Sequence, residues 1–207
     1  MSLLKSYKKT NGKTEVITAD NGSLKMIEMD MVVLQDGQSY TYSEKDKEFA
    51  LIILGGKCSV NGEDFNFDNI GRRKNVFEGA ATAVYIPRNK EFTIVAKGDV
   101  EIAVCKSPAL GDFKPKLISP EDVVIKQLGK NQWQREAHFI VDERTEANLL
   151  YIGEAFVEGG MWASYPPHKH DEDNMPQEGI LEEVYYFEFD KPQGFGIQKV
   201  YSKEGDI

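Results

Sequence analysis

The sequence predicts an all-β fold made of two successive β units. Three observations support this: the first hundred or so residues are short runs rich in Val, Ile, Tyr, Phe and Thr, turns containing glycine separate the runs, and no long helical stripe interrupts them. A similar series of runs resumes after Ala147. Short, evenly spaced strands of this kind are typical of a barrel or a two-sheet sandwich.

The strands of the first unit are expected between its turns. Asp36-Gly37 and Gly55-Gly56 end two apolar runs, and Asn61-Gly62 is placed to close a tight hairpin. The expected strands are Met31–Leu34, Phe49–Leu54, Lys57–Val60, Glu63–Phe67, Ala83–Pro87, Phe92–Ala96 and Val100–Val104.

A turn-rich stretch from Lys106 to Leu117 then predicts a connection that leaves the first unit. We therefore divide the chain into an N-terminal β domain at residues 1–115 and a second part at 116–207, which holds a connecting segment and the start of a second β domain. Its expected strands are Val123–Ile125, His138–Val141, Leu149–Val157, Met161–Tyr165, Leu181–Phe189 and Phe195–Tyr201.

Composition and charge exclude several classes of function. The formal net charge of −9 would repel a phosphate backbone, so nucleic acid is not expected as a partner. The first residues lack the apolar run of a secretory signal, and no later stretch is long and apolar enough to span a bilayer. We expect a cytoplasmic protein without a membrane partner.

The strongest chemical motif is Pro166-Pro167-His168-Lys169-His170. Residues i and i+2 of an extended chain point to the same side, so His168 and His170 can place two imidazole nitrogens about one metal ion. A surface pair of histidines without metal is the alternative. Lys169 is expected to point the other way.

A third ligand is expected from the alternation in Leu181–Phe189. One face of this expected strand carries Glu183 among Leu181, Tyr185, Phe187 and Phe189, which makes Glu183 the one charge on an apolar face. Burial of an unpaired carboxylate is costly, and a divalent cation would compensate that charge. Glu182, on the other face, is expected to be solvated.

Other polar residues give weaker indications. Arg72 and Arg73 are candidates to hold an anionic substrate, although a solvated turn is the commoner role of such a run. His138 is expected to be a hydrogen-bonded structural residue. The acidic loop at 171–179 is expected to be solvated at the rim of the pocket. No nucleophile motif is present in the sequence.

Several of these runs together resemble a known family. Tyr165-Pro166-Pro167-His168-Lys169-His170-Asp171, Leu181 to Tyr186 and Pro192 to Gly196, with Gly71-Arg72-Arg73, Val76 to Gly79 and Ala83 to Pro87 in the first half, are similar to the 5-deoxy-glucuronate isomerases of myo-inositol catabolism. These enzymes are relatives of the 5-keto-4-deoxyuronate isomerases. The resemblance covers nearly the whole chain.

The resemblance implies a bicupin, two cupin-like barrels in tandem, with a divalent metal in the second barrel. His168, His170 and Glu183 fall on three of its ligand positions, and the alternation selects Glu183 independently. The family's fourth ligand is a later histidine, whereas no histidine follows His170 here. The second barrel is therefore expected to be incomplete at its C-terminus, as in a truncated chain, and the exposed sheet edge predicts a homo-oligomer.

The implied reaction converts 5-deoxy-glucuronate, a small sugar acid, to 5-dehydro-2-deoxy-gluconate without an organic cofactor. Tyr185, Glu154 and metal-bound water are the candidate bases. Imidazole and carboxylate ligands accept several metals, of which zinc or manganese is expected. Two alternatives stay open: a non-haem iron cupin dioxygenase, because two histidines and a carboxylate also hold Fe(II), and a sugar-acid-binding bicupin without catalytic activity.

Overall fold

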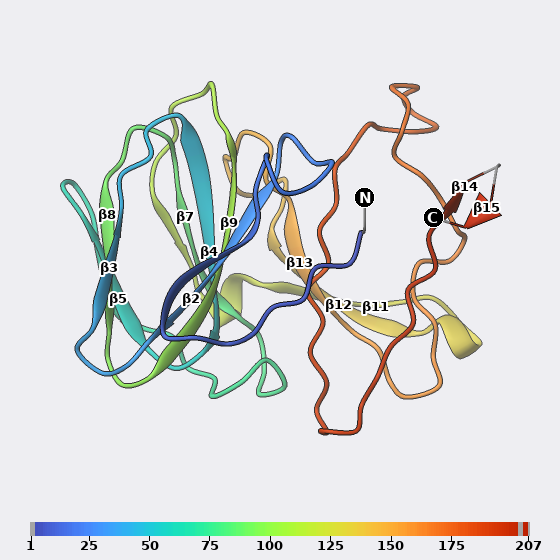
Figure 1. The fold of residues 1–207 in the computed structure, drawn as a ribbon, viewed down its shortest axis with the longest axis horizontal. Helices are drawn as coiled ribbons and strands as arrows, with labels where there is room; N and C mark the ends of the chain where they lie inside the picture. Colours follow the sequence, from blue (N-terminus) through green and yellow to red (C-terminus); the bar gives the residue numbers. More distant parts are fainter. Residues whose placement is uncertain (1–2, 203–204, 207) are drawn as a thin grey trace.

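The computed structural model describes residues 3–202 and 205–206, and its regular secondary structure is almost entirely β strand (Figure 1). Its strands are β1 (Gly12–Ile17), β2 (Glu28–Leu34), β3 (Ser39–Tyr42), β4 (Lys47–Gly55), β5 (Cys58–Gly62), β6 (Asn66–Ile70), β7 (Thr82–Ile86), β8 (Phe92–Ala96), β9 (Val100–Pro108), β10 (Lys116–Ile118), β11 (Val124–Leu128), β12 (Arg135–Val141), β13 (Ile152–Phe156), β14 (Tyr201–Ser202) and β15 (Gly205–Asp206).

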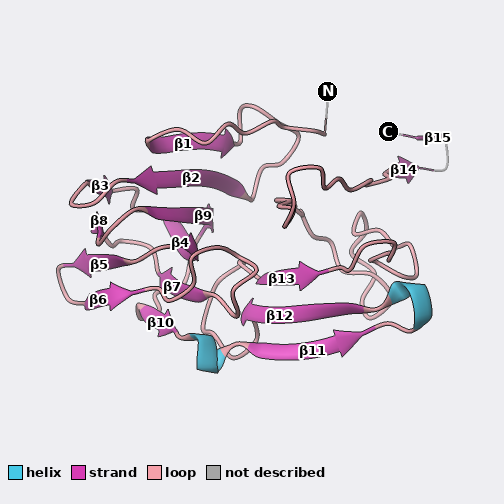
Figure 2. Ribbon diagram, turned by 90° about the horizontal axis from the view of Figure 1, so that it is seen from below, coloured by secondary structure: helices cyan, strands magenta, loops and turns pink. Residues whose placement is uncertain are grey.

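Two short 3-10 helices flank β11, as Figure 2 shows. They are η1 (Pro120–Asp122) and η2 (Asn131–Trp133). Within the described part of the chain, no helix has the length and apolar character needed to cross a membrane.

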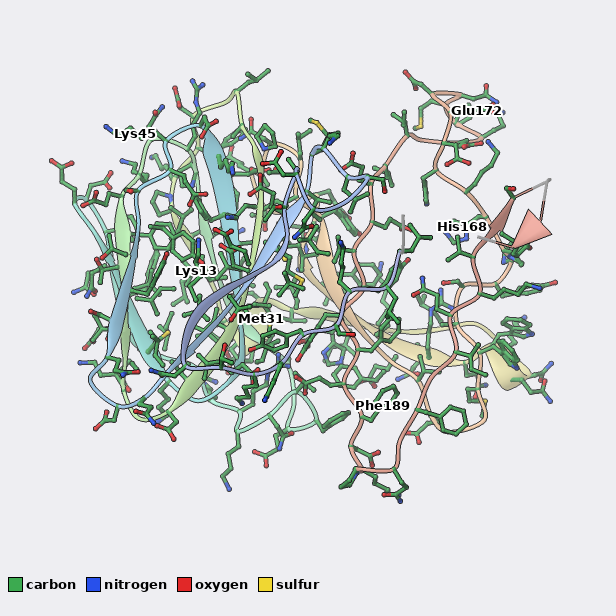
Figure 3. All side chains as sticks on the ribbon, in the orientation of Figure 1. Lys13, Met31, Lys45, His168, Glu172 and Phe189 are labelled. Carbon is green, nitrogen blue, oxygen red and sulfur yellow. The ribbon has the colours of Figure 1, made fainter. Side chains whose placement is uncertain are left out.

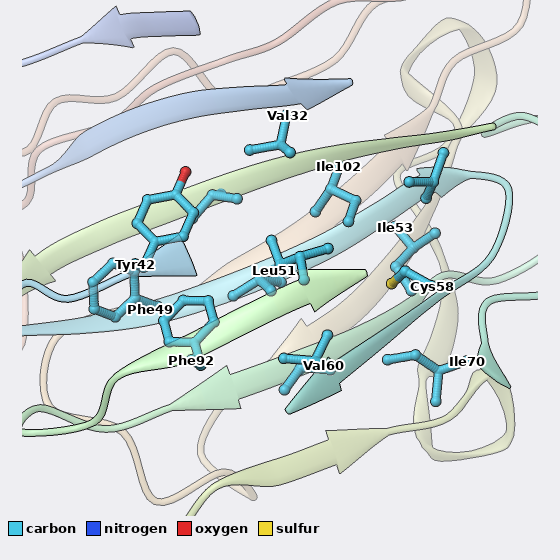
Figure 4. Close-up of a cluster of buried hydrophobic side chains, with 14 of the residues drawn as sticks. Val32, Tyr42, Phe49, Leu51, Ile53, Cys58, Val60, Ile70, Phe92 and Ile102 are labelled. Carbon is cyan, nitrogen blue, oxygen red and sulfur yellow. The ribbon is translucent and has the colours of Figure 1, made fainter. Parts of the chain in front are cut away.

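The first unit consists of two antiparallel sheets around a hydrophobic core. The larger sheet has the strand order β1-β2-β9-β4-β7-β10, and the smaller has the order β3-β8-β5-β6. Within the core, the rings of Tyr42, Phe49 and Phe92 lie together with centroids 5.1 to 5.4 Å apart (Figure 4). Side chains therefore fill the interior of this barrel, as is usual for small barrels.

The central strand β4 is buried on both of its faces. Phe49 and Leu51 point into the barrel core, whereas Ala50 and Ile52 belong to a second apolar cluster on the outer face of the sheet. Burial on both sides explains why this strand reads as a continuous apolar run rather than an alternating one. The second unit contributes to that outer cluster with Val123, Ile140, Val141 and Leu150.

The second unit contains the antiparallel sheet β11-β12-β13. β10 begins directly after the expected boundary at residue 115, yet it pairs with β7 of the first unit, with Lys116 opposite Tyr85. The connection between the units is thus built into the first sheet. The division into 1–115 and 116–207 stays a prediction.

The predicted all-β fold is confirmed, and the strands of the first unit match closely. β8 has the predicted bounds, and β9 continues four residues past its predicted end at Val104, to Pro108. The loop of the expected hairpin is longer than predicted. The Gly62 amide donates to the Phe65 carbonyl, and β6 begins at Asn66 rather than at Glu63. The polar strands β1, β3 and β10 were not predicted from the apolar pattern.

Three predicted strands of the second unit are wrong. The structure assigns no strand within Met161–Tyr165 or Leu181–Phe189, and in the last predicted run only Tyr201 is in a strand, β14, which pairs with β15. These segments have the composition of strands, but assignment also requires a hydrogen-bonded neighbour. Composition indicates that a segment can be extended, but it does not show whether another segment lies beside it to form those hydrogen bonds.

A buried carboxylate, that of Glu48, connects the two units. Its oxygens accept hydrogen bonds from the hydroxyls of Tyr85 and Ser107, each at 2.8 Å. They also accept hydrogen bonds from the backbone amides of residues 148–150, at 2.7, 2.7 and 2.9 Å. This segment leads into β13, so one side chain of β4 fixes the path by which the chain enters the second unit.

These hydrogen bonds determine the ionisation of Glu48. Burial alone would raise the pKa of its carboxyl group, but the amides of Asn148 and Leu149 and the hydroxyls of Tyr85 and Ser107 hold that pKa below its ordinary value of 4.5. Because the pKa is lower in the folded protein than in the unfolded chain, the stabilisation is complete above about pH 4.5 and is lost as the pH falls through the folded-state pKa.

We expect Glu48→Gln to lower the free energy of unfolding by about 2–4 kcal/mol at pH 7, because an amide group leaves part of this buried donor set without an acceptor. Urea unfolding at pH 7 and at several values below 4.5 provides the measurement. The difference between wild type and variant should shrink as the solution becomes more acidic. A constant difference across that range would contradict the role of the ionised carboxylate.

Candidate metal centre

His168 and His170 lie on an irregular extended segment of the second unit; Figure 3 labels His168. His168 Nδ1 lies 3.0 Å from the Pro166 carbonyl oxygen, and His170 Nδ1 lies 2.9 Å from the Gly179 carbonyl oxygen. A carbonyl only accepts, so each Nδ1 carries the proton. In the neutral form, each Nε2 therefore has a free lone pair, which is the arrangement of metal-binding histidines.

Glu183 joins the two histidines from a neighbouring segment. The Leu181 amide donates to the His170 carbonyl at 3.1 Å, which places the two segments side by side. Glu183 Oε1 lies 3.9 Å from His170 Nε2, and one ligand atom from each of the three side chains lies within 4.8 Å of the others. The histidine rings are nearly perpendicular, at 85°, with centroids 5.1 Å apart.

The second oxygen of Glu183 is held separately. The Tyr185 hydroxyl donates to Glu183 Oε2 at 3.2 Å, which leaves Oε1 toward the histidines. Burial, the charge of Glu183 and this hydrogen bond all raise the pKa of the Tyr185 phenol. Tyr185 is therefore a protonated donor near neutral pH, and the geometry gives it an orienting role.

This donor set fits a divalent cation. Two imidazole nitrogens and one carboxylate oxygen converge, each Nδ1 proton is taken by a backbone carbonyl, and the carboxylate brings a negative charge to the point of convergence. Three protein ligands also leave coordination positions open to a substrate. His168, His170 and Glu183 are thus arranged as predicted, and their role as ligands is a proposal developed below.

The predicted environment of Glu183 needs correction. The face that carries it was expected to be buried, but Leu181, Tyr185 and Phe187 are more than half exposed and the Glu183 side chain is 43 % exposed. The opposite face packs against the first unit instead. Glu182, which was expected to be solvated, is partly buried and accepts hydrogen bonds from three backbone amides. The alternating pattern divided the side chains between the two faces correctly, but the prediction of which face is buried was wrong.

The other candidate residues are engaged elsewhere. The Arg73 guanidinium is buried and forms a two-pronged ion pair with Glu154, including a contact of 2.9 Å, and it also donates to the carbonyls of Ile53 and Gly79. Arg72 is exposed and pairs with Glu121. The geometry therefore ties Arg73 and Glu154 to each other; substrate binding by either arginine and base catalysis by Glu154 stay predictions.

His138 was expected to be a hydrogen-bonded structural residue; one of its ring nitrogens has such a bond, whereas its buried Nδ1 has no hydrogen-bond partner among the described residues. It is buried, its Nε2 lies 2.7 Å from Glu136 Oε1, and its ring packs on Phe156 with centroids 4.7 Å apart. His138 and Glu136 line a pocket of about 430 Å³ with Arg135 and residues of the first unit. The grouping of His168, His170 and Glu183 does not include His138.

The acidic loop at 171–179 is folded around one of its own carboxylates. Glu178 accepts from the amides of Asp171 and Glu172, at 2.7 and 2.9 Å, and forms an ion pair with Lys169 at 2.7 Å. This pair draws Lys169 away from the histidines on either side of it, as the i, i+2 pattern predicts. Gly179, at the end of the loop, supplies the carbonyl that orients His170.

Comparison with known proteins assigns the chain to a family. The sequence pattern of the KduI/IolB family matches residues 3–207. The chain belongs to the KduI/IolB family. A 5-deoxy-glucuronate isomerase of Bacillus subtilis strain 168 is 39% identical over 206 residues, covering 98% of this chain and 76% of the relative. That of Halalkalibacterium halodurans is 40% identical over 193 residues, covering 92% of this chain and 72% of the relative.

The fold agrees with the same assignment. An IolB-like protein from Salmonella typhimurium LT2 matches this KduI/IolB family chain with a TM-score of 0.94 at 34% identity, over 100% of this chain and 80% of that protein. A putative glyoxylate-induced protein from Pseudomonas aeruginosa shares the fold with a TM-score of 0.54 at 9% identity. Relatives of this similarity and coverage are isomerases, and so is this chain.

We expect Glu154→Gln to act on stability rather than on chemistry. The change leaves the buried Arg73 guanidinium without its counter-charge, so we expect a loss of about 3 kcal/mol in the free energy of unfolding. The turnover number of the folded variant should stay within about threefold of wild type, whereas loss of a general base costs about 10²–10⁴ in rate. Urea unfolding and initial rates measured on one preparation separate the two roles.

Proposed function

We propose that this chain converts 5-deoxy-glucuronate to 5-dehydro-2-deoxy-gluconate in myo-inositol catabolism, with a divalent cation held by His168, His170 and Glu183. The substrate is supported by the names of relatives that cover more than nine-tenths of the chain. The cation is supported by one observation above all: both histidines are fixed through Nδ1, and one ligand atom from each lies within 4.8 Å of a Glu183 oxygen.

The reaction moves hydrogen between neighbouring carbons of an aldehyde and a ketone. A bound divalent ion would polarise the carbonyl and hold the adjacent hydroxyl as negative charge develops on oxygen. Residues around the ligands hold the ligand side chains in place. The Pro166 and Gly179 carbonyls keep the two rings oriented, and Tyr185 keeps Glu183 oriented, so the ligand atoms need little rearrangement.

The proton must be carried by a group near the substrate carbons, within about 2.6–3.2 Å. Tyr185 is a donor to Glu183, and Glu154 is paired with Arg73. Both geometries favour a positioning role over a basic one. Zinc or manganese is the cation we propose, because imidazole and carboxylate ligands suit both.

Location and assembly remain part of the proposal. We propose a cytoplasmic protein that acts on a small sugar acid and forms a homo-oligomer. Large apolar side chains exposed along residues 181–201 support self-association, because contiguous apolar surface usually marks a contact site.

Substitution of the ligands tests the proposed function. We expect His170→Asn or Glu183→Gln to lower kcat/KM for 5-deoxy-glucuronate at least a hundredfold, and to lower bound metal measured by mass spectrometry, because each removes a donor atom that nothing replaces. Glu172→Gln is the matched control, since Glu172 is 69% exposed in the same acidic loop and lies outside the donor group.

Turnover without oxygen separates this proposal from an iron dioxygenase, for which the same donor set is suited. Isomerisation at an equal rate in anaerobic buffer supports the isomerase. Product formation that requires O₂ and iron would overturn it, and so would full activity in His170→Asn.

Tyr185→Phe distinguishes an orienting residue from a base. We expect a loss of about tenfold in metal affinity, typical of removing a partner of a ligand, and a turnover number at saturating metal within about tenfold of wild type. Metal titration and initial rates over a series of metal concentrations give both quantities. If turnover at saturating metal falls by about a thousandfold, Tyr185 takes part in proton transfer.

A further inference from the structure

Glu182 forms a long-range contact with the first unit. Its carboxylate accepts hydrogen bonds from three consecutive backbone amides: Lys25 at 2.8 and 3.0 Å, Met26 at 2.7 Å and Ile27 at 3.2 Å. The partners are separated from Glu182 by 155 to 157 residues in sequence. In Figure 1, the loop before β2 lies beside the orange-red segment that carries Glu182.

This contact is well suited to hold Glu182 in one place on the first unit. Hydrogen bonds from amides to a carboxylate are charge-assisted, and consecutive N–H groups form a concave anion site. The three amides directly precede β2, which is paired along its length with β9 in the larger sheet. Glu182 is therefore attached to a rigid part of the first unit.

The segment that carries Glu182 and Glu183 is not held by a sheet. Residues 181–189 are extended but belong to no assigned strand. Their inner face rests on the first unit: Val184 packs against the outer cluster, and the Tyr186 ring meets Tyr7 with centroids 6.4 Å apart. In this extended segment, neighbouring side chains point to opposite sides. Fixing Glu182 toward the first unit thus turns Glu183 toward the histidines.

We propose that Glu182 is a positioning residue for the metal centre, and that through it the amides of residues 25–27 set the place of Glu183 relative to His168 and His170. This inference rests on the proposed metal centre. It adds that the first unit, which contributes no residue to the donor group, determines the geometry of that centre.

A metal titration on the full chain tests the inference. Zn²⁺ affinity is measured by competition with a chelator for wild type, Glu182→Gln and Glu182→Ala, and the visible spectrum of bound Co²⁺ reports the ligand geometry. We expect affinity to fall about tenfold in Glu182→Gln and about a hundredfold in Glu182→Ala, the range seen when partners of metal ligands are removed, with a changed Co²⁺ spectrum.

Glu188→Gln is the matched control. Glu188 lies on the same inner face, is also partly buried, and accepts from the Tyr186 hydroxyl at 3.0 Å rather than from the first unit's backbone. We expect its Zn²⁺ affinity to stay within about twofold of wild type, because this contact anchors the segment to no backbone of the first unit and lies outside the donor group. Circular dichroism of each variant shows whether a loss of affinity reflects unfolding, and Glu182→Gln keeps the size of the side chain.

Hydrogen exchange in metal-free protein gives a second readout. We expect the amides of residues 25–27 and the Leu181 amide to exchange faster in Glu182→Gln than in wild type. The inference is overturned if wild type binds Zn²⁺ and Glu182→Ala binds it equally well, or if Glu188→Gln loses as much affinity as Glu182→Gln. If wild type binds neither Zn²⁺ nor Co²⁺, the proposed metal centre itself is wrong and the positioning role is lost with it.

Discussion

The second unit depends on the buried carboxylate of Glu48. A charged group that is fully removed from water requires hydrogen bonds in nearly every direction, and Glu48 obtains them from two hydroxyls of the first unit and from the amides of residues 148–150. The cost of burying the charge is offset only when the chain enters the second unit along this path. The contact therefore selects one arrangement of the two units as well as stabilising it.

Two further carboxylates extend the same principle across the interface. Glu154 of β13 meets the buried guanidinium of Arg73, and Glu182 meets the amides before β2. Glu48 of the first unit accepts from amides of the second unit, whereas Glu154 and Glu182 of the second unit meet donors of the first. Some of the acidic residues that give the chain its negative net charge are therefore paired inside the molecule, and the net charge alone does not indicate this.

The sequence predicted most reliably those features that depend on local pattern. Continuous burial made β4 and β7 recognisable, and the i, i+2 spacing brought His168 and His170 together. Features that depend on distant partners were missed. Nothing near Glu182 in the sequence indicates that amides more than 150 residues away surround it, and alternation in Leu181–Phe189 distinguishes two faces without showing which one meets the first unit. The strand expected there failed for the same reason, since pairing is a long-range property.

The division of labour between the two units follows from their packing. The first barrel is filled by bulky side chains such as Tyr42, Phe49 and Phe92, and this packing makes it rigid. The segments that carry the two histidines and Glu183 are the reverse, open and without regular sheet pairing. A metal centre requires ligands held within a fraction of an ångström, which such segments do not achieve alone. Anchoring them at Glu182 and at residues 148–150 connects the proposed metal centre to the packed barrel, and in our proposal this is how residues far from the ligands set their geometry.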